Sequence, residues 1–341
     1  MPQMNLNFNY LMEWKYMYHI CSFTDSGYWM NTIRTLYSQW YTMCFIAFIL
    51  VCPTQTKSEE RLQQLRKPVV LVYGGPRAKG VELKIENIDQ YMKSPNVIEI
   101  GPSILSHPGG YEVHQPLLNH WKQQDKLLLR RVYTVDFKPD GSRHDYLVLE
   151  ELIRRWTAAM QENYVDGISI DEFDTGKYEL VHIWITALQE LRKRFPNKYI
   201  FCWSCHQLRS QDLLTSIRDF ADYIIPEIYY KESDFHGSRK RNFHLFRTTV
   251  EQMSKLAPGI EEKILIGIGT YEAGLDDIAL VDFGEFVDEQ IQFIARDQQL
   301  RCIAGIALFA PMHARFEYVQ RWDETITQSL LYTECLRNAC K

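Results

Sequence analysis

Two carboxylates stand side by side where an apolar, β-branched segment ends. Residues 164–174 read YVDGISIDEFD, so the chain passes from alternating isoleucines directly into Asp171 and Glu172. A pair of carboxyl groups in different surroundings can divide the work of hydrolysis, because one donates a proton while the other attacks or positions water. Asp174 follows closely, and we interpret it as a helix cap. The question is therefore which elements bring a second strand's carboxylate to this point.

A regular succession of short apolar runs answers part of that question. Eight runs rich in Val, Ile and aromatic residues occur at 68–73, 96–101, 127–134, 167–173, 199–205, 223–230, 264–270 and 303–310. Segments with helical three- and four-residue spacing lie between them, for example 146–161, 178–194 and 284–299. This alternation predicts an α/β protein with a single (β/α)₈ barrel. A doubly wound open sheet is the alternative, but the first run is followed by Gly74-Gly75-Pro76 and not by GxGxxG.

Alternation along the strands predicts which acids face the barrel interior. On the fourth strand Ser169 and Asp171 share one face, and the large apolar residues beside them suit the opposite face under the helices. On the sixth strand the same reasoning directs Glu227 inward, near the end of the strand. Catalytic groups of such barrels lie at the carboxyl ends of strands. We therefore expect Asp171 and Glu227 to meet at the mouth, with Glu172 just beyond the strand end.

Paired inward carboxylates with aromatic neighbours point to cleavage of glycosidic bonds, for which one acid protonates the leaving oxygen. The candidate substrate-binding residues are Tyr73, Arg130, Trp203, His206, Tyr229 and Tyr271, several of which could stack on sugar rings at strand ends. A structural interpretation competes at one point, because Glu99 on the second strand can pair with Arg130 or Arg131 on the third.

The DGISIDEF stretch resembles (β/α)₈ glycoside hydrolases that carry an essential carboxylate on strand four, such as the α-galactosidase clan. It also resembles the family 114 endo-α-1,4-polygalactosaminidases, which have an Asp at the end of strand four and a Glu on strand six. That resemblance implies Asp171 as nucleophile and Glu227 as general acid/base.

Two further resemblances bear on the same stretch. The family 18 chitinase pattern DGxDxDxE is approached through Asp166, Gly167 and Asp171. Ser169 replaces its middle Asp, and Phe173 stands at the position of its catalytic Glu. The β-hexosaminidases have an adjacent Asp-Glu pair on strand four, in which the Glu is the acid, and this implies a role for Glu172. The resemblance covers the barrel architecture and fewer than ten residues.

Residues 1–56 differ from the rest of the chain and are predicted to form an N-terminal leader or anchor. They contain the apolar run 43–52 (MCFIAFILVC), which is typical of a signal peptide and too short to span a bilayer comfortably. We therefore expect residues 57–341 to form the catalytic barrel, secreted or anchored to a membrane through 43–52. Five of the eight cysteines lie beyond residue 57, and Cys335 could pair with Cys340 after export.

Composition and motifs limit the classes of binding partner and cofactor that we expect. The formal net charge of −5 and the absence of a long basic segment disfavour nucleic acid and leave a carbohydrate as the expected partner. No cofactor or metal is expected, because the first strand has no HxH and Cys202-Trp-Ser-Cys205 has no second CxxC. On a strand these two sulfurs should diverge. Two alternatives to a glycosidase stay open: a barrel that binds a glycan or partner without catalysis, and a metal-dependent hydrolase.

Overall fold

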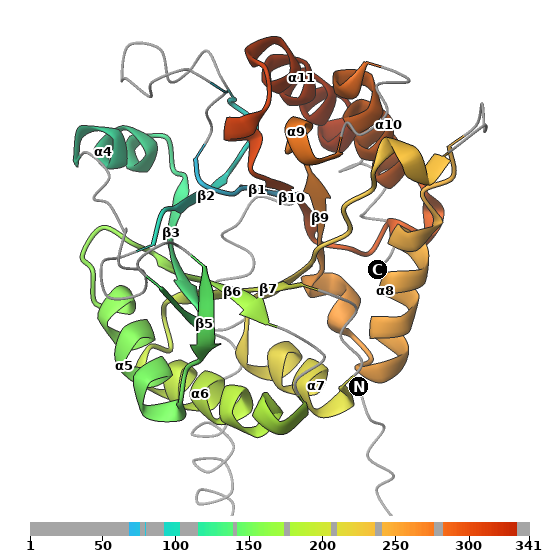
Figure 1. Ribbon diagram of the computed structural model, residues 1–341. Helices are drawn as coiled ribbons and strands as arrows, with labels where there is room; N and C mark the ends of the chain where they lie inside the picture. The colour runs from blue at the N-terminus through green and yellow to red at the C-terminus, as the bar shows by residue number, and fades with distance from the viewer. Residues whose placement is uncertain are drawn as a thin grey trace, which may run out of the picture. The chain divides into compact units, whose positions relative to one another are not determined.

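Eight parallel strands form the centre of the structure, as Figure 1 shows. In chain order they are β1 (Val69–Val72), β2 (Val97–Ile100), β3 (Leu127–Tyr133), β6 (Gly167–Phe173), β7 (Tyr199–Ser204), β8 (Tyr223–Pro226), β9 (Leu265–Gly269) and β10 (Gly305–Phe309). Each falls inside one of the eight runs predicted from the sequence. Their spatial order is β8-β7-β6-β3-β2-β1-β10-β9.

The sheet closes on itself. Parallel bridges join Ile224 to Ile264 and Glu227 to Gly267, and these connect β8 with β9. Closure excludes the doubly wound open sheet and confirms the (β/α)₈ barrel.

The computed structural model describes residues 68–75, 79, 92–102, 115–138, 142–173, 178–205, 210–235, 241–275 and 282–332. All of them belong to one unit, Leu62–Lys341. The predicted leader 1–56 lies outside the described residues, as do Asp174, His206, Cys335 and Cys340. Among the described helices, none combines the length and apolar character needed to cross a bilayer.

Helices surround the strands (Figure 1). They are α4 (Gln115–Gln123), α5 (Leu149–Met160), α6 (Val181–Arg194), α7 (Gln211–Phe220), α8 (His244–Leu256), α9 (Glu272–Leu275), α10 (Phe283–Arg296) and α11 (Phe316–Tyr332). Short 3₁₀ segments are η2 (Tyr178–Leu180), η3 (Glu232–Phe235), η4 (Ile260–Lys263), η5 (Gln298–Leu300) and η6 (Pro311–His313). Side-chain caps fix two starts, because Ser210 accepts from Leu213 N at 3.3 Å and Asp282 accepts from Glu285 N at 3.0 Å.

An antiparallel hairpin was not anticipated. β4 (Val135–Phe137) and β5 (Arg143–Tyr146) pair directly after β3, so α5 begins at Leu149 and the predicted start at residue 146 is too early. The hairpin leaves the carboxyl end of β3, and the ring of Phe137 lies 4.6 Å from that of Tyr133. It therefore adds residues to the mouth side of the barrel.

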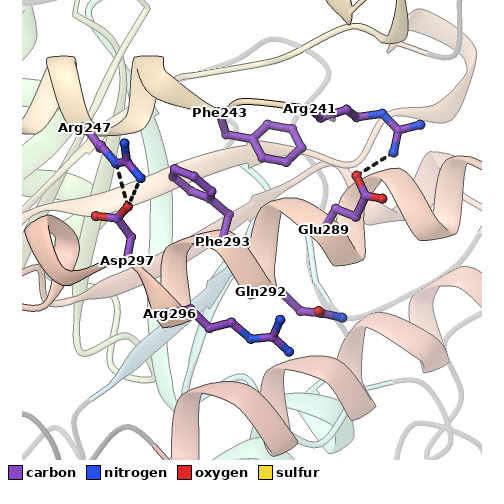
Figure 2. Close-up of a pocket in the computed structure, with 8 residues that line it drawn as sticks. All are labelled: Arg241, Phe243, Arg247, Glu289, Gln292, Phe293, Arg296 and Asp297. Carbon is purple, nitrogen blue, oxygen red and sulfur yellow. Dashed lines mark hydrogen bonds and ion pairs between the residues drawn. The ribbon is translucent and has the colours of Figure 1, made fainter. Parts of the chain in front are cut away.

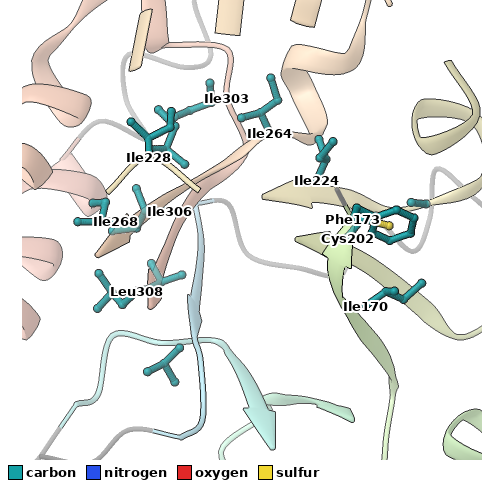
Figure 3. Close-up of a cluster of buried hydrophobic side chains, with 14 of the residues drawn as sticks. Ile170, Phe173, Cys202, Ile224, Ile228, Ile264, Ile268, Ile303, Ile306 and Leu308 are labelled. Atoms are coloured by element: carbon teal, nitrogen blue, oxygen red, sulfur yellow. The ribbon is translucent and has the colours of Figure 1, made fainter. Parts of the chain in front are cut away.

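Two apolar layers separate the faces of the strands. Outward side chains such as Ile170, Ile224, Ile268 and Leu308 pack with the helices in one large cluster, part of which Figure 3 shows. A second cluster fills the barrel, and its members are Val69, Leu71, Val97, Leu129, Tyr199, Phe201, Trp203, Tyr223, Ile225, Leu265, Ala304 and Ala307. Because a parallel sheet buried on both faces excludes water, polar side chains inside it need partners.

Candidate active site at the barrel mouth

The end of β6 is a bulge that places two consecutive carboxylates. The pairing of β6 with β7 shifts between Ile170 and Phe173, and Glu172 has a left-handed backbone with φ 69°. A non-glycine residue in this region is strained. Thr134 stabilises the bend, because its N–H donates to Asp171 O at 3.1 Å and its hydroxyl donates to Glu172 O. The extra residue leaves Phe173 on the outer face, in the helix-side cluster.

Asp171 faces the interior as alternation predicted, and it is 7% exposed. Its Oδ2 accepts from the hydroxyl of Tyr73 at 2.9 Å, and its Oδ1 accepts from Glu172 N at 2.9 Å. Burial, followed by the charges of Glu99 and Glu172, raises the pKa of Asp171 to about 7. The charge of Arg131 and the Tyr73 hydrogen bond oppose that rise.

Glu227 joins Asp171 from the other side of the mouth. Its N–H donates to Ser204 O at 3.1 Å on β7, and it bridges to Gly267 on β9. Burial is again the main cause that raises the pKa of Glu227, here to about 8, and the charge of Asp171 is second. The phenol of Tyr229 opposes the rise. The charge of Asp171 thus disfavours ionisation of Glu227, so the two acids are close enough to interact electrostatically.

Glu172 is the third carboxylate of this group. It is half-buried, and its Oε2 accepts from Cys205 Sγ at 3.2 Å. Its charge contributes to the raised pKa values of both Asp171 and Glu227. The structure therefore brings the three predicted carboxylates together.

A buried polar network lies below these acids. Arg131 Nε donates to Glu99 Oε1 at 2.5 Å, and Glu99 Oε2 accepts from Ser169 Oγ at 2.6 Å and Trp203 Nε1 at 2.9 Å. The structural pair predicted for Glu99 is therefore formed with Arg131. Trp203 is fully buried in this network, so it offers no face to a sugar and its predicted stacking role is wrong.

Arg130 requires a second correction. It points to the outer face of β3, where Nε donates to Glu162 at 2.7 Å and a guanidinium N–H donates to Gly101 O at 2.8 Å. It also contacts the hydroxyl of Tyr164. Because adjacent strand residues face opposite sides, only Arg131 can reach the interior.

The predicted tyrosines occupy different depths. Tyr73 touches Asp171 and has its ring 5.4 Å from that of Trp203. Tyr229 stacks on Phe309 at 4.9 Å, beside Glu227, and its buried hydroxyl has no hydrogen-bond partner of regular geometry among the described residues. Tyr271 is 38% exposed beyond β9 and contacts the ring of His313. Of the three, Tyr271 presents the most open ring.

Cys202 and Cys205 diverge as predicted. Cys202 packs in the helix-side cluster, whereas Cys205 faces the carboxylates. Burial and the charges of Glu227 and Glu172 raise the pKa of the Cys205 thiol, which keeps it protonated as a donor to Glu172.

Several mouth residues were not anticipated from the sequence. Tyr133 pairs in register with Asp171, and its hydroxyl is 3.4 Å from Arg131 Nη1. Phe309 packs on Tyr73 and Tyr229. The period-two pattern that identified Asp171 also applies to Leu129, Arg131 and Tyr133 on β3, so the signal for Tyr133 was present.

A separate cavity of about 470 Å³ lies between α8 and α10, as Figure 2 shows. Two ion pairs flank it, Arg247 Nε to Asp297 at 2.6 Å and Arg241 Nη1 to Glu289 at 2.5 Å. Phe243 and Phe293 lie between them. Both acids among the eight lining residues, Glu289 and Asp297, are paired with arginines, so this cavity does not present a pair of unpaired carboxylates. Within the described ranges, no group of three or more His, Cys, Asp or Glu is placed to hold a metal ion.

Comparison with known proteins finds a likeness in structure and none in sequence families. No family model and no curated protein matches the chain. The structure is similar to a GH18 chitinase from Pseudoalteromonas aurantia, with TM-score 0.52 and 13% identity over 77% of this chain and 100% of that one. A chitinase from Bacteroides thetaiotaomicron gives TM-score 0.52 and 12% identity over 77% and 96%. The chain shares the (β/α)₈ barrel fold of these two chitinases.

The likeness concerns the fold alone, because identities this low do not carry residues or substrates across. It agrees with the resemblance to glycoside hydrolase barrels drawn from DGISIDEF. It does not support the finer assignment to the α-galactosidase clan or family 114, since the two structures compared above are a GH18 chitinase and another chitinase.

Proposed function

We propose that this chain is a glycoside hydrolase that cleaves glycosidic bonds of a poly- or oligosaccharide with Asp171 and Glu227. The observation that carries the proposal is the meeting of two carboxyls at the carboxyl ends of β6 and β8, the buried Asp171 and the half-buried Glu227, with pKa values raised to about 7 and about 8. The reaction requires two carboxyl groups, one that donates a proton and one that acts as a nucleophile or positions water. The glycoside hydrolase fold supports the same reaction class.

Unequal hydrogen bonding assigns the two roles. Asp171 accepts from Tyr73 and from Glu172 N, both of which stabilise its anion. Glu227 has only the phenol of Tyr229 to oppose its burial, so it holds a proton at neutral pH. Glu227 then donates that proton to the glycosidic oxygen as the bond to the anomeric carbon breaks. Asp171 attacks the anomeric carbon, and water activated by the deprotonated Glu227 later hydrolyses the glycosyl ester.

Glu172 and the mouth tyrosines complete the proposed site. Glu172 is half-buried at the mouth and suits contact with sugar hydroxyls. Tyr271 presents a partly exposed ring beyond β9, where a sugar can stack. His206 remains a candidate from the sequence, as does the extracytoplasmic location based on residues 43–52.

The test combines a polysaccharide panel with substitution of the acids. Asp171→Asn and Glu227→Gln should each reduce hydrolysis about 10³-fold or more while the circular dichroism spectrum is unchanged. NMR of the first-formed product should show the anomeric configuration of the substrate retained. Near-normal activity of both variants would overturn the assignment.

One observation favours an alternative, a barrel that binds glycans without cleaving them. Phe173 stands where the chitinase pattern has its acid, and it is buried against Trp156 and Trp184. Calorimetry that detects binding of an oligosaccharide, together with no turnover across the panel, would favour this alternative.

A further inference from the structure

Among the described residues, Arg131 is a cation whose charge acts on the candidate nucleophile Asp171, although its ion pair is with Glu99. Its guanidinium carbon lies 3.6 Å from the ring centroid of Tyr73, and the hydroxyl of that ring donates to Asp171 Oδ2 at 2.9 Å. A cation over the face of a phenol is attracted to it, so the ring is clamped from one side. The arginine therefore acts on the carboxylate through one intervening side chain.

The position of Arg131 is fixed by a carboxylate that is itself fixed. Glu99 is fully buried and accepts from Arg131 Nε at 2.5 Å, while Ser169 and Trp203 donate to its other oxygen. Groups on β2, β3, β6 and β7 thus hold one ion pair inside the barrel. Gly74 leaves room nearby, because a Cβ there would lie 3.5 Å from an Arg131 nitrogen and 1.9 Å from Met312.

We propose that Arg131 is a positioning residue which, held by Glu99 over the ring of Tyr73, fixes the phenol against Asp171 and favours the ionised form of that carboxyl. The catalytic part of this inference rests on the proposed function, whereas the electrostatic part concerns Asp171 alone. It agrees with the roles proposed above, in which Glu227 after β8 holds the proton and Asp171 on β6 is ionised.

The charges around Asp171 predict shifts of its titration in opposite directions, which can be tested. The groups that face it are Tyr73, Glu99, Arg131, Tyr133, Glu172, Cys205, Glu227 and Tyr229. Arg131 lowers the pKa of Asp171, and Glu99 raises it. Removing either charge alone should therefore shift the titration in opposite directions, and removing both should nearly cancel.

The experiment follows the ¹³C resonance of the Asp171 carboxyl from pH 4 to pH 9 in protein with labelled aspartate, assigned with Asp171→Asn. Arg131→Met should move the midpoint up by about one pH unit or more, and Glu99→Gln should move it down by a similar amount. The double variant should titrate near the wild type, and it also avoids leaving one buried charge unpaired if Arg131→Met folds poorly. Tyr73→Phe should raise the midpoint.

Arg130→Met is the matched control. It removes an arginine from the neighbouring position of the same strand, but on the outer face, where Arg130 pairs with Glu162. It should lower the melting temperature and leave the Asp171 midpoint in place. An unmoved midpoint in Arg131→Met and in Glu99→Gln would overturn the inference.

Activity provides a separate readout. If hydrolysis is found, the acid limb of the kcat/KM profile should move up in Arg131→Met and stay in place in Arg130→Met. If no substrate is turned over, the proposed function fails while the carbon titration still decides the role of Arg131.

Discussion

Acidic residues lie at both ends of the barrel, but their partners differ between the two ends. At the amino-terminal ends of the strands, Asp166 immediately precedes β6 and Asp222 immediately precedes β8. Asp166 accepts from Leu128 N at 2.8 Å and pairs with Lys122. Asp222 accepts from Ile200 N at 2.8 Å and pairs with Arg192 at 2.6 Å. Each acid therefore has both a backbone donor and a cation.

At the carboxyl ends of the same two strands, Asp171 and Glu227 have no cation in direct contact among the described residues. Their pKa values are raised, mainly by burial, to about 7 and about 8. The partners of an acid, more than its place at a strand end, thus decide whether it stabilises the barrel or is available for proton transfer. Asn96 before β2 repeats the structural arrangement with an amide, since it accepts from Val70 N at 2.9 Å.

The largest effect on stability should come from Asp222→Ala. The change leaves Arg192 without its carboxylate and Ile200 N without an acceptor in a buried place, which should cost about 3 kcal/mol in the free energy of unfolding. Denaturant unfolding measures this loss, and activity assayed below the melting transition should be kept. Asp166→Ala should cost less, because Lys122 is more exposed than Arg192. Equal losses at both sites would contradict the difference in burial.

Neutralising an acid at the mouth should increase stability, whereas the loss of Asp222 should decrease it. A carboxyl whose pKa is higher in the folded state than in the unfolded chain stabilises the fold only while protonated, so stability falls as pH rises from about 4 through about 7 for Asp171. Asp171→Asn should therefore increase the unfolding free energy at pH 8 by about 2 kcal/mol and change little near pH 4. Chemical denaturation at both pH values makes the comparison. Destabilisation of Asp171→Asn at pH 8 would mean that the ionised carboxyl of Asp171 does not destabilise the fold.

The smallest expected effect concerns the backbone of Glu172. Glu172→Gly removes the side-chain clash of a left-handed residue and should stabilise the fold by about 1 kcal/mol. Glu172→Gln keeps the clash and removes the charge, so it serves as the matched control for the backbone term. Thermal unfolding of the pair separates the two contributions, and a loss of stability in the glycine variant greater than in the glutamine variant would refute strain at this bulge.

The sequence predicted the fold more completely than the site. Eight β-branched runs identified all eight barrel strands, and the period of two placed Asp171 and Glu227 correctly on the interior face. On β3 that period was ambiguous, because Arg130 and Arg131 are adjacent and both faces contain leucine. The structure resolves the ambiguity through the outward pair of Arg130 with Glu162.

Depth along a strand and backbone handedness could not be predicted from local pattern. Trp203 occupies an interior position, but its depth depends on the register of β7 against β6 and on the Glu99 network from a strand about a hundred residues earlier. The left-handed φ of Glu172 depends on Thr134, which lies 38 positions away. Local propensities contain no information about such contacts.

The junction of β8 with β9 has a dynamic consequence. It is formed by two isolated bridges, whereas β9 and β10 are joined by five consecutive pairs. Glu227 itself supplies one of those bridges, opposite Gly267, so a candidate catalytic group sits at one of the two junctions between the described barrel strands with only two strand pairs, the other being that of β1 with β2. We expect amides on either side of this junction to exchange with deuterium before those of β3 and β6. Opening of the barrel at this junction would then also change the distance between Asp171 and Glu227.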